Sequence, residues 1–518
     1  MFAIPGIVAL VVFIYARPQE FIERLRVIPF LYLFFGLALV GALLDLRVRN
    51  LKLTATPQLP WIVLFFLWSS FTVLVHAPTS AASPIMGLLI CVILYLLIAQ
   101  GVQTFRALHV VAGTVLCMVL LVCGVGAHQG FAPMGCVMLD EAAERDTAAG
   151  KPDGRPCDTI RTCNLGETEP GADYACEHIG LFGTTSVGGG RVRYRGVLQD
   201  PNELALAGGV GLPLAFAFGQ VRKGRFGQSV ITWTAFALVL LCAVLTGSRG
   251  GQLVFATVLA AYFARRFGAR GLFIGGLLAL PLLLLGGRSG AEAESSTTER
   301  LDLLTEALSM WRSHPLLGVG LGQFTEWSYM TAHNSYLLAL AELGFPGMVL
   351  FSIIVYLSAK VPLVAYRTIT PLPRPSSTWN TESTSVGAGD GRHPPLEPLD
   401  QCASEHRSGA RSTGEHSGSL KAAAGGELLA QGAPLTRPWA MAMTAAFAGL
   451  AIGIFFLSFT YHYVLWIYIG LSGAFYSAIR THYPSFRVRI GMRDFVLVVA
   501  VDVVIIVFVF LYTKWALR

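Results

Sequence analysis

Charge is scarce in this sequence. Asp, Glu, Lys and Arg make up only 13% of its 518 residues, whereas 54% are hydrophobic. A soluble protein does not usually carry many apolar runs of about 20 residues, which is the length with which a helix crosses a bilayer. The composition therefore argues against a soluble protein and indicates one that crosses a membrane many times.

The apolar runs predict where the membrane spans lie. Since lipid offers no water to the backbone, a segment that crosses it must be helical. We therefore predict an all-α polytopic membrane protein with about 12 to 13 transmembrane helices. The first run has no charged segment before it and no small-residue cleavage site, so it is expected to remain as an anchor. The candidate spans are 2–16, 28–44, 60–76, 84–99, 107–126, 203–220, 229–246, 252–264, 271–286, 334–357, 439–458, 463–479 and 494–513.

Lys and Arg predict the sidedness, because they collect in short cytoplasmic loops. Loop 17–27 is the exception, since it carries three arginines on the predicted outside. The loops placed inside by their cations are 45–59, 100–106, 221–228, 265–270 and 480–493. The resulting organisation is N-terminal membrane helices (1–126), a cysteine-containing outside loop (127–202), membrane helices (203–286), an outside loop with an amphipathic helix (287–333), one membrane helix (334–358), an inside linker (359–438) and C-terminal membrane helices (439–518).

The inside linker has a different composition from the rest of the chain. Residues 371–437 are rich in Ser, Gly, Thr, Pro and Ala and show no apolar period. This pattern predicts disorder. A connection between two helical blocks is favoured over a partner-binding segment.

Four of the nine cysteines fall in the outside loop 127–202, at Cys136, Cys157, Cys163 and Cys176. Four cysteines in one polar loop favour two disulfides in an oxidising compartment, with three possible connectivities. The alternative is a zinc site made of four thiolates, but the paired C-x2-C spacing is missing. No set of His, Asp and Glu has metal-ligand spacing either, so we expect no metal site.

The first polar cluster is "RVRYRGVLQDPNELALAGG", residues 191–209. Asp200, Pro201 and Glu203 have the form of a helix start, with a capping aspartate, a proline at the first position and a glutamate that reaches back. Helix capping does not explain the arginines before it, which include Arg193 and Arg195. They either meet lipid phosphate at the membrane face or bind the phosphate of a ligand.

The second polar cluster is "LTGSRGGQLVF", residues 245–255. Arg249 is the cation of a short loop predicted to lie outside, which runs against the usual charge bias. The glycines around it allow a ligand to approach the backbone. A tight hairpin with a snorkelling arginine is the alternative.

The third polar cluster ends the second outside loop. Leu301, Leu304, Leu308 and Trp311 follow a helical spacing with charged residues between them, which predicts an amphipathic helix at the interface. The chain then reaches "HNSYLLALAELGFPG", residues 333–347. His333 is either a catalytic group or a polar residue at a helix entrance, and Asn334 is a candidate N-cap.

A carboxylate lies inside the helix that follows. Glu342 is about nine residues into this span, on the order of 13 Å along the axis. A carboxylate at that depth must be protonated, paired or turned to a cavity. Gly344 and Pro346 come directly after it and predict a kink.

These clusters, in this order, resemble the O-antigen ligase and O-antigen polymerase superfamily of bacterial envelope glycosyltransferases. The matching stretches are "RYRGVLQDPNELA" (193–205), "TGSRGG" (246–251), "ERLDLLTEALSMWRSHPLLGVGLGQF" (299–324) and "HNSYLLALAELGFPG" (333–347). The cysteine-bearing part of loop 127–202 and the insert 371–437 depart from the usual pattern of the family.

The resemblance implies a GT-C-like enzyme of the bacterial inner membrane whose active site faces the periplasm. It implies a glycan donor linked to undecaprenyl pyrophosphate and an acceptor hydroxyl on lipid A–core or on a second lipid-linked glycan. Membrane lipid surrounds the site, and no cofactor, metal or nucleic acid is implied. The roles that it implies are pyrophosphate binding by Arg195 and Arg249, with Arg193 beside them, and an acceptor-side catalytic role for His333. Supporting roles are expected for Asn202, Ser248, Asn334 and Glu342.

Two other functions compete with glycan transfer by a ligase. A polymerase joins lipid-linked repeat units with the same chemistry, and this sequence does not separate it from a ligase. A flippase or transporter for lipid-linked oligosaccharide would suit the many helices, but transporters place ionisable groups near the membrane midplane. Here the polar groups crowd one rim of the predicted bundle.

Overall fold

The computed structural model describes residues 1–49, 51–139, 151–164, 173–195, 198–221, 226–285, 291–369 and 435–516. Within these ranges, nine helices are long and apolar enough to cross a membrane. They are α1 (Ala3–Ala16), α2 (Phe30–Arg47), α3 (Leu59–His76), α4 (Ala82–Gly101), α5 (Phe105–Gly130), α7 (Pro201–Val221), α8 (Phe226–Leu245), α13 (Ser335–Thr368) and α16 (Met492–Ala516).

The remaining candidate spans are helical too. They form α9 (Arg249–Phe267), α10 (Ala269–Leu285), a helix over 435–453 and α15 (Tyr463–His482). The prediction of an all-α polytopic membrane protein is therefore confirmed. Several ends differ from the prediction: α13 continues to Thr368 instead of ending near residue 358, 435–437 begin a helix instead of ending the linker, and that helix ends at 453 instead of 458. The rest of the predicted disordered segment lies outside the described residues.

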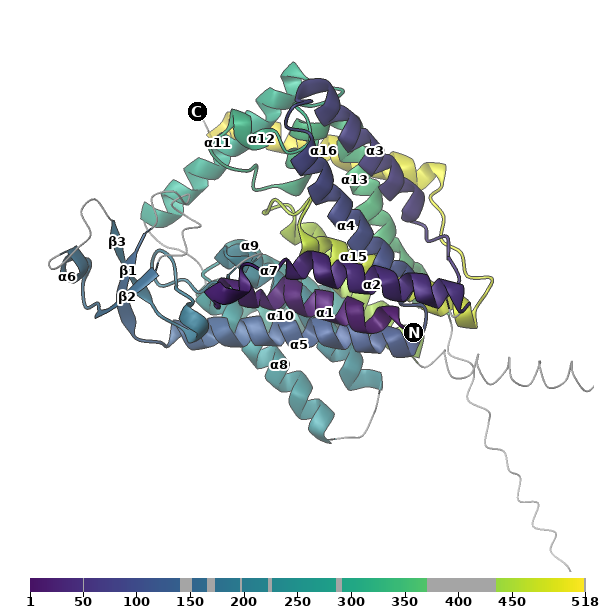
Figure 1. Ribbon diagram of the computed structural model, residues 1–518, viewed down its shortest axis with the longest axis horizontal. Coiled ribbons are helices and arrows are strands. Elements are labelled where there is room, and N and C mark those ends of the chain that lie inside the picture. Colours follow the sequence, from purple (N-terminus) through teal and green to yellow (C-terminus); the bar gives the residue numbers. More distant parts are fainter. Residues whose placement is uncertain are drawn as a thin grey trace, which may run out of the picture.

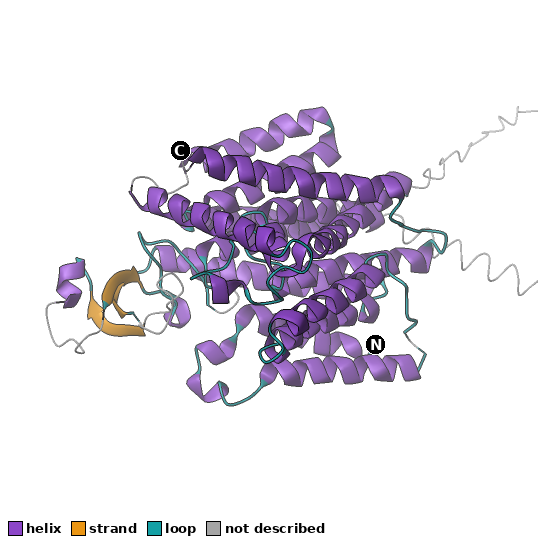
Figure 2. Ribbon diagram, turned by 90° about the horizontal axis from the view of Figure 1, so that it is seen from above, coloured by secondary structure: helices purple, strands orange, loops and turns teal. Residues whose placement is uncertain are grey.

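The helices form one bundle with a small sheet at one end (Figures 1 and 2). The N-terminus lies at the end opposite the sheet, and α5 runs along the bundle toward it. At the sheet end, loop 17–27 contains two short 3-10 helices, η1 (Pro18–Glu20) and η2 (Glu23–Leu25). Tyr194 donates a hydrogen bond to the Ala16 carbonyl, so this loop lies beside the cysteine-containing segment. The basic loop 17–27 and loop 127–202, both predicted to lie outside, thus share one side of the bundle.

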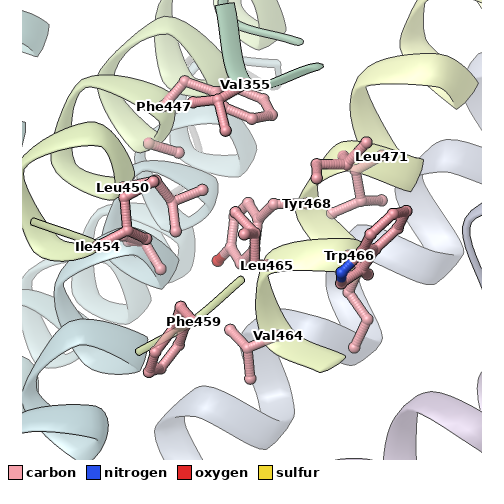
Figure 3. Packing of buried hydrophobic residues seen from close by; sticks show 14 of the residues in the cluster. Val355, Phe447, Leu450, Ile454, Phe459, Val464, Leu465, Trp466, Tyr468 and Leu471 are labelled. Carbon is pink, nitrogen blue, oxygen red and sulfur yellow. The ribbon is translucent and has the colours of Figure 1, made fainter. Parts of the chain in front are cut away.

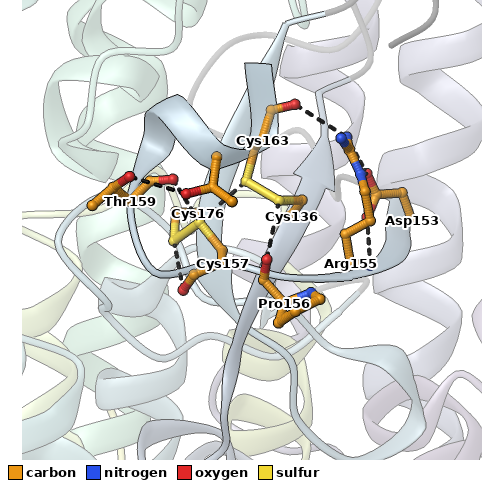
Figure 4. Close-up of a disulfide and its surroundings, with 9 residues drawn as sticks. Cys136, Asp153, Arg155, Pro156, Cys157, Thr159, Cys163 and Cys176 are labelled. Atoms are coloured by element: carbon orange, nitrogen blue, oxygen red, sulfur yellow. Dashed lines mark hydrogen bonds and ion pairs between the residues drawn. A yellow bond between two sulfur atoms is a disulfide. The ribbon is translucent and has the colours of Figure 1, made fainter. Parts of the chain in front are cut away.

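The sheet was not expected in an all-helical protein. Its strands β1 (Met134–Met138), β2 (Lys151–Pro156) and β3 (Tyr174–His178) pair antiparallel in the order β2-β1-β3. Disulfides join Cys136 to Cys163 and Cys157 to Cys176, and Cys163 lies on the short helix α6 (Ile160–Asn164) (Figure 4). Since a sheet of this size has little core of its own, the two cross-links stabilise it mainly by restricting the unfolded loop.

The centre of the bundle is apolar and is organised by α15. Residues along this helix from Val464 to Ile479 are buried on every side. Leu465 and Tyr468 lie between α15 and the helix over 435–453, which carries Phe447, Leu450 and Ile454, whereas Trp466 lies on another side of α15 (Figure 3). A helix that is apolar all round belongs at the middle of a bundle, whereas α2, α8 and α16 leave much of their apolar surface exposed, as lipid-facing helices do.

The kink in α13 is confirmed and has a specific partner. Gly344 has φ 71°, which interrupts the helix. The carbonyls freed there accept hydrogen bonds from a loop that follows the predicted amphipathic helix: Val319 N–H donates to Ala341 O (2.9 Å) and Gly320 N–H to Glu342 O (2.8 Å). Pro315 O in turn accepts from Phe345 N–H (3.0 Å). We call this contact between residues 315–320 and 341–345 the kink clamp.

Candidate functional site

Two helix starts lie together at the sheet end of the bundle. Asp200 caps α7, where its Oδ1 accepts from Asn202 N–H (2.8 Å) and its own N–H donates to Glu203 Oε2 (3.4 Å), as the helix-start pattern predicts. Ser248 caps α9, where its Oγ accepts from Gly251 N–H (2.9 Å). The Ser248 hydroxyl also donates to Asn202 Oδ1 (2.6 Å). Asn202 and Ser248 thus fix the two helix starts to each other.

Arg249 is the first residue of α9. The glycines after it have different tasks. A Cβ added to Gly251 would lie 2.2 Å from Ala205 Cβ, so this glycine lets α9 pack tightly against α7. Gly250 lines a cavity beside Arg249. Of these two glycines, Gly250 therefore has the position expected for close ligand approach.

His333 ends the loop that leads into α13. Its backbone is in the left-handed region, with φ 46°, and its side chain is half-buried. Asn334 follows as the N-cap, and its Oδ1 accepts from Tyr336 N–H (3.0 Å) and Leu337 N–H (3.1 Å). Ser335 then donates its hydroxyl to Leu457 O (2.6 Å). The cap and this tether hold His333 at a fixed place at the mouth of α13.

Arg249, His333 and Asn334 line one cavity of about 670 Å³. Its polar groups come from the starts of α9 and α13, from α11 (Ala291–Ser313), the predicted amphipathic helix, and from Tyr512 of α16. Its other wall is apolar, formed by residues of α9, α11, α16 and the segment after the helix over 435–453. The apolar lining residues are Leu253, Leu301, Leu304, Phe455, Phe456, Phe508 and Val509.

The amphipathic helix closes this cavity on one side. Leu301 and Leu308 of its predicted stripe are buried, and so are Leu303, Ala307 and Met310. The stripe is thus wider than predicted, because α11 packs on both α13 and α16. Near its end, the Arg312 guanidinium lies 4.7 Å from the centre of the Phe510 ring of α16.

Arg195 does not line this cavity. The resemblance implies that Arg195, Arg249 and His333 act at one site, but only Arg249 and His333 share this cavity. Arg195 donates to Glu20 O (3.2 Å) and to Gly183 O, and its guanidinium lies 5.7 Å from the centre of the Phe21 ring. These contacts tie loop 17–27 to the segment before α7. A separate cavity of about 260 Å³ lies here, lined by Glu20, Arg26, Lys151, Thr185, Arg193, Tyr194, Arg195 and Gln199.

Arg193 is buried in the protein itself. Its Nε donates to Thr185 O (3.0 Å) and its backbone N–H to Gln129 Oε1 (2.9 Å). Burial lowers the pKa of Arg193, an effect that the nearby Glu177 opposes. The sequence analysis expected lipid phosphate or ligand phosphate as the partner of these arginines. Arg193 instead donates to a carbonyl of the protein itself.

Glu342 does not line the 670 Å³ cavity. Its Oε1 accepts from Phe324 N–H (3.2 Å) and its Oε2 from the Tyr461 hydroxyl (2.9 Å). The carboxylate therefore anchors the start of α12 (Phe324–Trp327) and the turn before α15. At this depth the carboxylate thus has two neutral hydrogen-bond donors as partners, and it does not contact His333 in the described structure.

The sequence analysis assigned no role to four polar residues of the cavity, one of which is Tyr512 of α16. Thr297 and Arg300 lie on α11, which the sequence analysis predicted as an amphipathic helix without giving its polar residues a role. Gln252 lies on α9, three residues after Arg249. The helical spacing from Arg249 to Gln252 was a signal that could have found it, since residues three apart share a face.

Residues 234–352 match the family whose model is described as O-Antigen ligase. This range includes Ser248, Arg249, Gln252, all of α11 and the start of α13, and it excludes Arg193 and Arg195. No curated protein matches the chain. The matched range thus supplies most of the 670 Å³ cavity.

Proposed function

We propose that this chain transfers a glycan from undecaprenyl pyrophosphate to an acceptor hydroxyl, because its residues 234–352 match the family described as O-Antigen ligase. One observation supports this proposal above the others. A single cavity brings Arg249, Arg300 and His333 against a largely apolar wall. Such a cavity suits an amphiphile with an anionic head and an isoprenoid tail.

The apolar wall suits the lipid part of the donor. Leu253 belongs to α9, Leu304 to α11 and Phe508 to α16, which is among the most lipid-exposed helices. A groove between such helices allows an isoprenoid chain to enter from the bilayer while its head reaches the polar groups. Burial of apolar surface contributes roughly 25 cal/mol per Å² to such binding.

Arg249 and Arg300 are proposed to hold the pyrophosphate. Guanidinium groups bind phosphate oxygens with two parallel hydrogen bonds. Negative charge grows on the pyrophosphate as the bond to the sugar breaks, and fixed cations in a cavity of low dielectric stabilise that charge. We infer that the guanidinium groups serve this purpose without a metal ion.

His333 is proposed to act on the acceptor. A neutral imidazole takes the proton of the acceptor hydroxyl while its oxygen attacks the anomeric carbon. The bond from that carbon to the pyrophosphate oxygen breaks, and the pyrophosphate leaves with the electron pair. One displacement of this kind inverts the anomeric centre. The Asn334 cap and the Ser335 tether supply the fixed position that a general base needs.

Arg193 and Arg195 are proposed to support this site from a neighbouring position. The hydrogen bond between Ser248 and Asn202 links the start of α9 to α7, and α7 follows the arginine segment. Disulfides beside this rim suit an oxidising compartment, which favours a site facing the periplasm from the bacterial inner membrane.

The test is to replace Arg249 and His333 separately by alanine in cells that depend on this chain for surface glycan. Protein level in the membrane is measured first and surface glycan second. Arg106→Ala and His128→Ala are matched controls, since both side chains are exposed and lie outside the cavity. We expect loss of glycan in the first pair and normal glycan in the controls. Normal glycan in both site variants at normal protein level would refute the proposal.

Ligase and polymerase activities are separated by deletion. Loss of a ligase leaves long glycan chains on the lipid carrier, whereas loss of a polymerase leaves single repeat units. Purified protein separates both from a flippase, because a flippase moves the donor without breaking its bond to the sugar. We propose the ligase type, since the matched family is described as O-Antigen ligase.

A further inference from the structure

Two buried amides in the cavity lack a hydrogen-bond partner for their NH2 groups. They are Nε2 of Gln252 and Nδ2 of Asn334, and neither has a partner among the described residues. The two residues are 2% and 1% exposed. Both line the cavity that holds Arg249 and His333. Buried polar groups without partners are rare, and each one requires an explanation.

The fold fixes where these donors lie. Gln252 is three residues after Arg249 on α9, so the two share a face of the helix. Asn334 is next to His333, and its Oδ1 is occupied by the N–H groups of Tyr336 and Leu337. The cap thus holds the amide in one orientation and leaves its NH2 group available to a ligand. The Gln252 NH2 donor therefore belongs to the same part of the cavity as Arg249, and the Asn334 NH2 donor to the same part as His333.

In the empty protein neither NH2 group has a described hydrogen-bond partner, and of the two residues only Asn334 has a structural task, which its oxygen performs as the cap of α13. Leaving an amide unpaired in a buried place costs free energy, because the group has given up water and gained no other partner. The site contains NH2 donors and cations, so it complements a group that offers several oxygen acceptors. The pyrophosphate of the donor and the sugar attached to it both have this chemistry.

We propose that Gln252 and Asn334 form an oxygen-binding subsite that positions the donor's pyrophosphate–sugar junction between Arg249 and His333. This inference rests on the proposed function and adds to it two positioning residues. The ligand class is an oxygen-rich group of the lipid-linked donor. Gln252 holds the side nearer Arg249, and Asn334 holds the side nearer His333.

The test uses purified full-length protein in detergent and two probes, undecaprenyl pyrophosphate without sugar and the glycan-bearing donor. Gln252→Leu keeps the approximate side-chain volume and removes the NH2 group. We expect binding of at least one probe to weaken about tenfold, the usual effect of losing one hydrogen bond to a charged or well-placed group. The midpoint of thermal unfolding without ligand should stay the same or rise, because no bond is lost.

Gln58→Leu is the matched control. Gln58 is fully buried, lies outside the cavity, and its Nε2 donates to Ser472 Oγ (3.1 Å). We expect the opposite pattern for it, a lower midpoint and unchanged binding. Asn334→Ser is the second variant, since a serine hydroxyl retains the cap while the NH2 group is lost. It should weaken binding with little change in the midpoint.

Gln252→Glu shows whether the Gln252 NH2 group binds an oxygen of the pyrophosphate or an oxygen of the sugar. A carboxylate repels a phosphate but accepts a hydrogen bond from a sugar hydroxyl. Weaker binding of both probes assigns the Gln252 contact to the pyrophosphate. Weaker binding of the glycan-bearing probe by Gln252→Leu, restored by Gln252→Glu, assigns it to the sugar.

Arg249→Ala separates this inference from the proposed function. If Arg249→Ala abolishes binding while Gln252→Leu and Asn334→Ser bind both probes normally, the subsite is wrong and the proposed function stands. If Arg249→Ala also binds normally, the proposed function fails and the subsite fails with it. A lower unfolding midpoint for Gln252→Leu in the absence of ligand would also overturn the inference, because it would mean that the amide has a partner in the empty protein.

Discussion

Gly318 is the residue on which the kink clamp depends most directly. It has φ +64°, and a Cβ added there would lie 2.3 Å from the carbonyl carbon of Glu342. Its neighbours Val319 and Gly320 donate the hydrogen bonds that satisfy Ala341 O and Glu342 O. We expect Gly318→Ala to push the loop away from α13 and to break both bonds.

The loss of folding free energy expected for Gly318→Ala follows from these contacts. Placing a non-glycine residue in the left-handed region costs about 1 kcal/mol. Two lost backbone hydrogen bonds cost about 1 kcal/mol each, and more where the carbonyl stays buried without a partner. The expected loss is therefore about 3 kcal/mol, a large fraction of the stability of a typical domain. Because the loop after the clamp leads to His333, we also expect slower glycan transfer in the protein that remains folded.

The assay is thermal unfolding of the purified protein in detergent. Glycan transfer is then measured at a temperature where the wild-type and Gly318→Ala proteins are both folded. Gly87→Ala is the matched control, because Gly87 is in α4 and an added Cβ there meets nothing within 4 Å. Alanine stabilises a helix interior relative to glycine by about 0.5–1 kcal/mol, so the control should unfold at the same temperature or higher. The reasoning is refuted if Gly318→Ala unfolds at the same temperature as the Gly87→Ala protein.

Three further variants test other parts of the structure. Arg195→Ala should destabilise the folded protein by about 2 kcal/mol, measured by thermal unfolding, because two carbonyls lose their donor; an unchanged midpoint would show that the arginine does not hold loop 17–27. Cys157→Ser should make the loop that carries the sheet sensitive to limited proteolysis, since a disulfide closing a loop of this size contributes about 3 kcal/mol; equal digestion of both proteins would contradict this. Asn334→Ala should lose about 1 kcal/mol through the cap, whereas Asn334→Ser should not; equal unfolding midpoints of the two variants would exclude a capping role.

The fold could be predicted because its signals are local. A membrane span depends on about 20 consecutive residues, and every predicted run forms a helix over most of its described length. The start of α7 at Pro201, the cap at Asn334 and the kink at Gly344 also depend on neighbouring residues in the chain. The sheet was missed because β2 has the sequence KPDGRP, which has no strand pattern, and its pairing with β1 depends on contacts distant in sequence.

The site could be predicted only in part, for the same reason. The positions of Arg249 and His333 at helix starts follow from the sequence, and the structure brings them to one cavity. The position of Arg195 does not follow, because its partners are backbone carbonyls at Glu20 and Gly183, which no side-chain pattern reveals. The spacing from Arg249 to Gln252 indicates a shared helix face, but that this face lines a cavity depends on residues of α11, α13 and α16 that are distant in sequence.

The placement of Arg195 changes how the first polar cluster is related to the cavity that the second and third clusters line. If all the arginines bound the ligand, the first cluster would be part of the same cavity as the others, and its side chains would be turned toward it. Instead, Arg193 and Arg195 bind Thr185 O and two other carbonyls, while Ser248 joins the first cluster to Arg249 through Asn202. We therefore propose that the first cluster supports the cavity indirectly, through the hydrogen bond between Ser248 and Asn202 that joins the starts of α9 and α7. It follows that lysine at Arg195, which cannot reach two carbonyls in the same planar geometry, should disturb folding before it disturbs donor binding, whereas lysine at Arg249 should do the reverse.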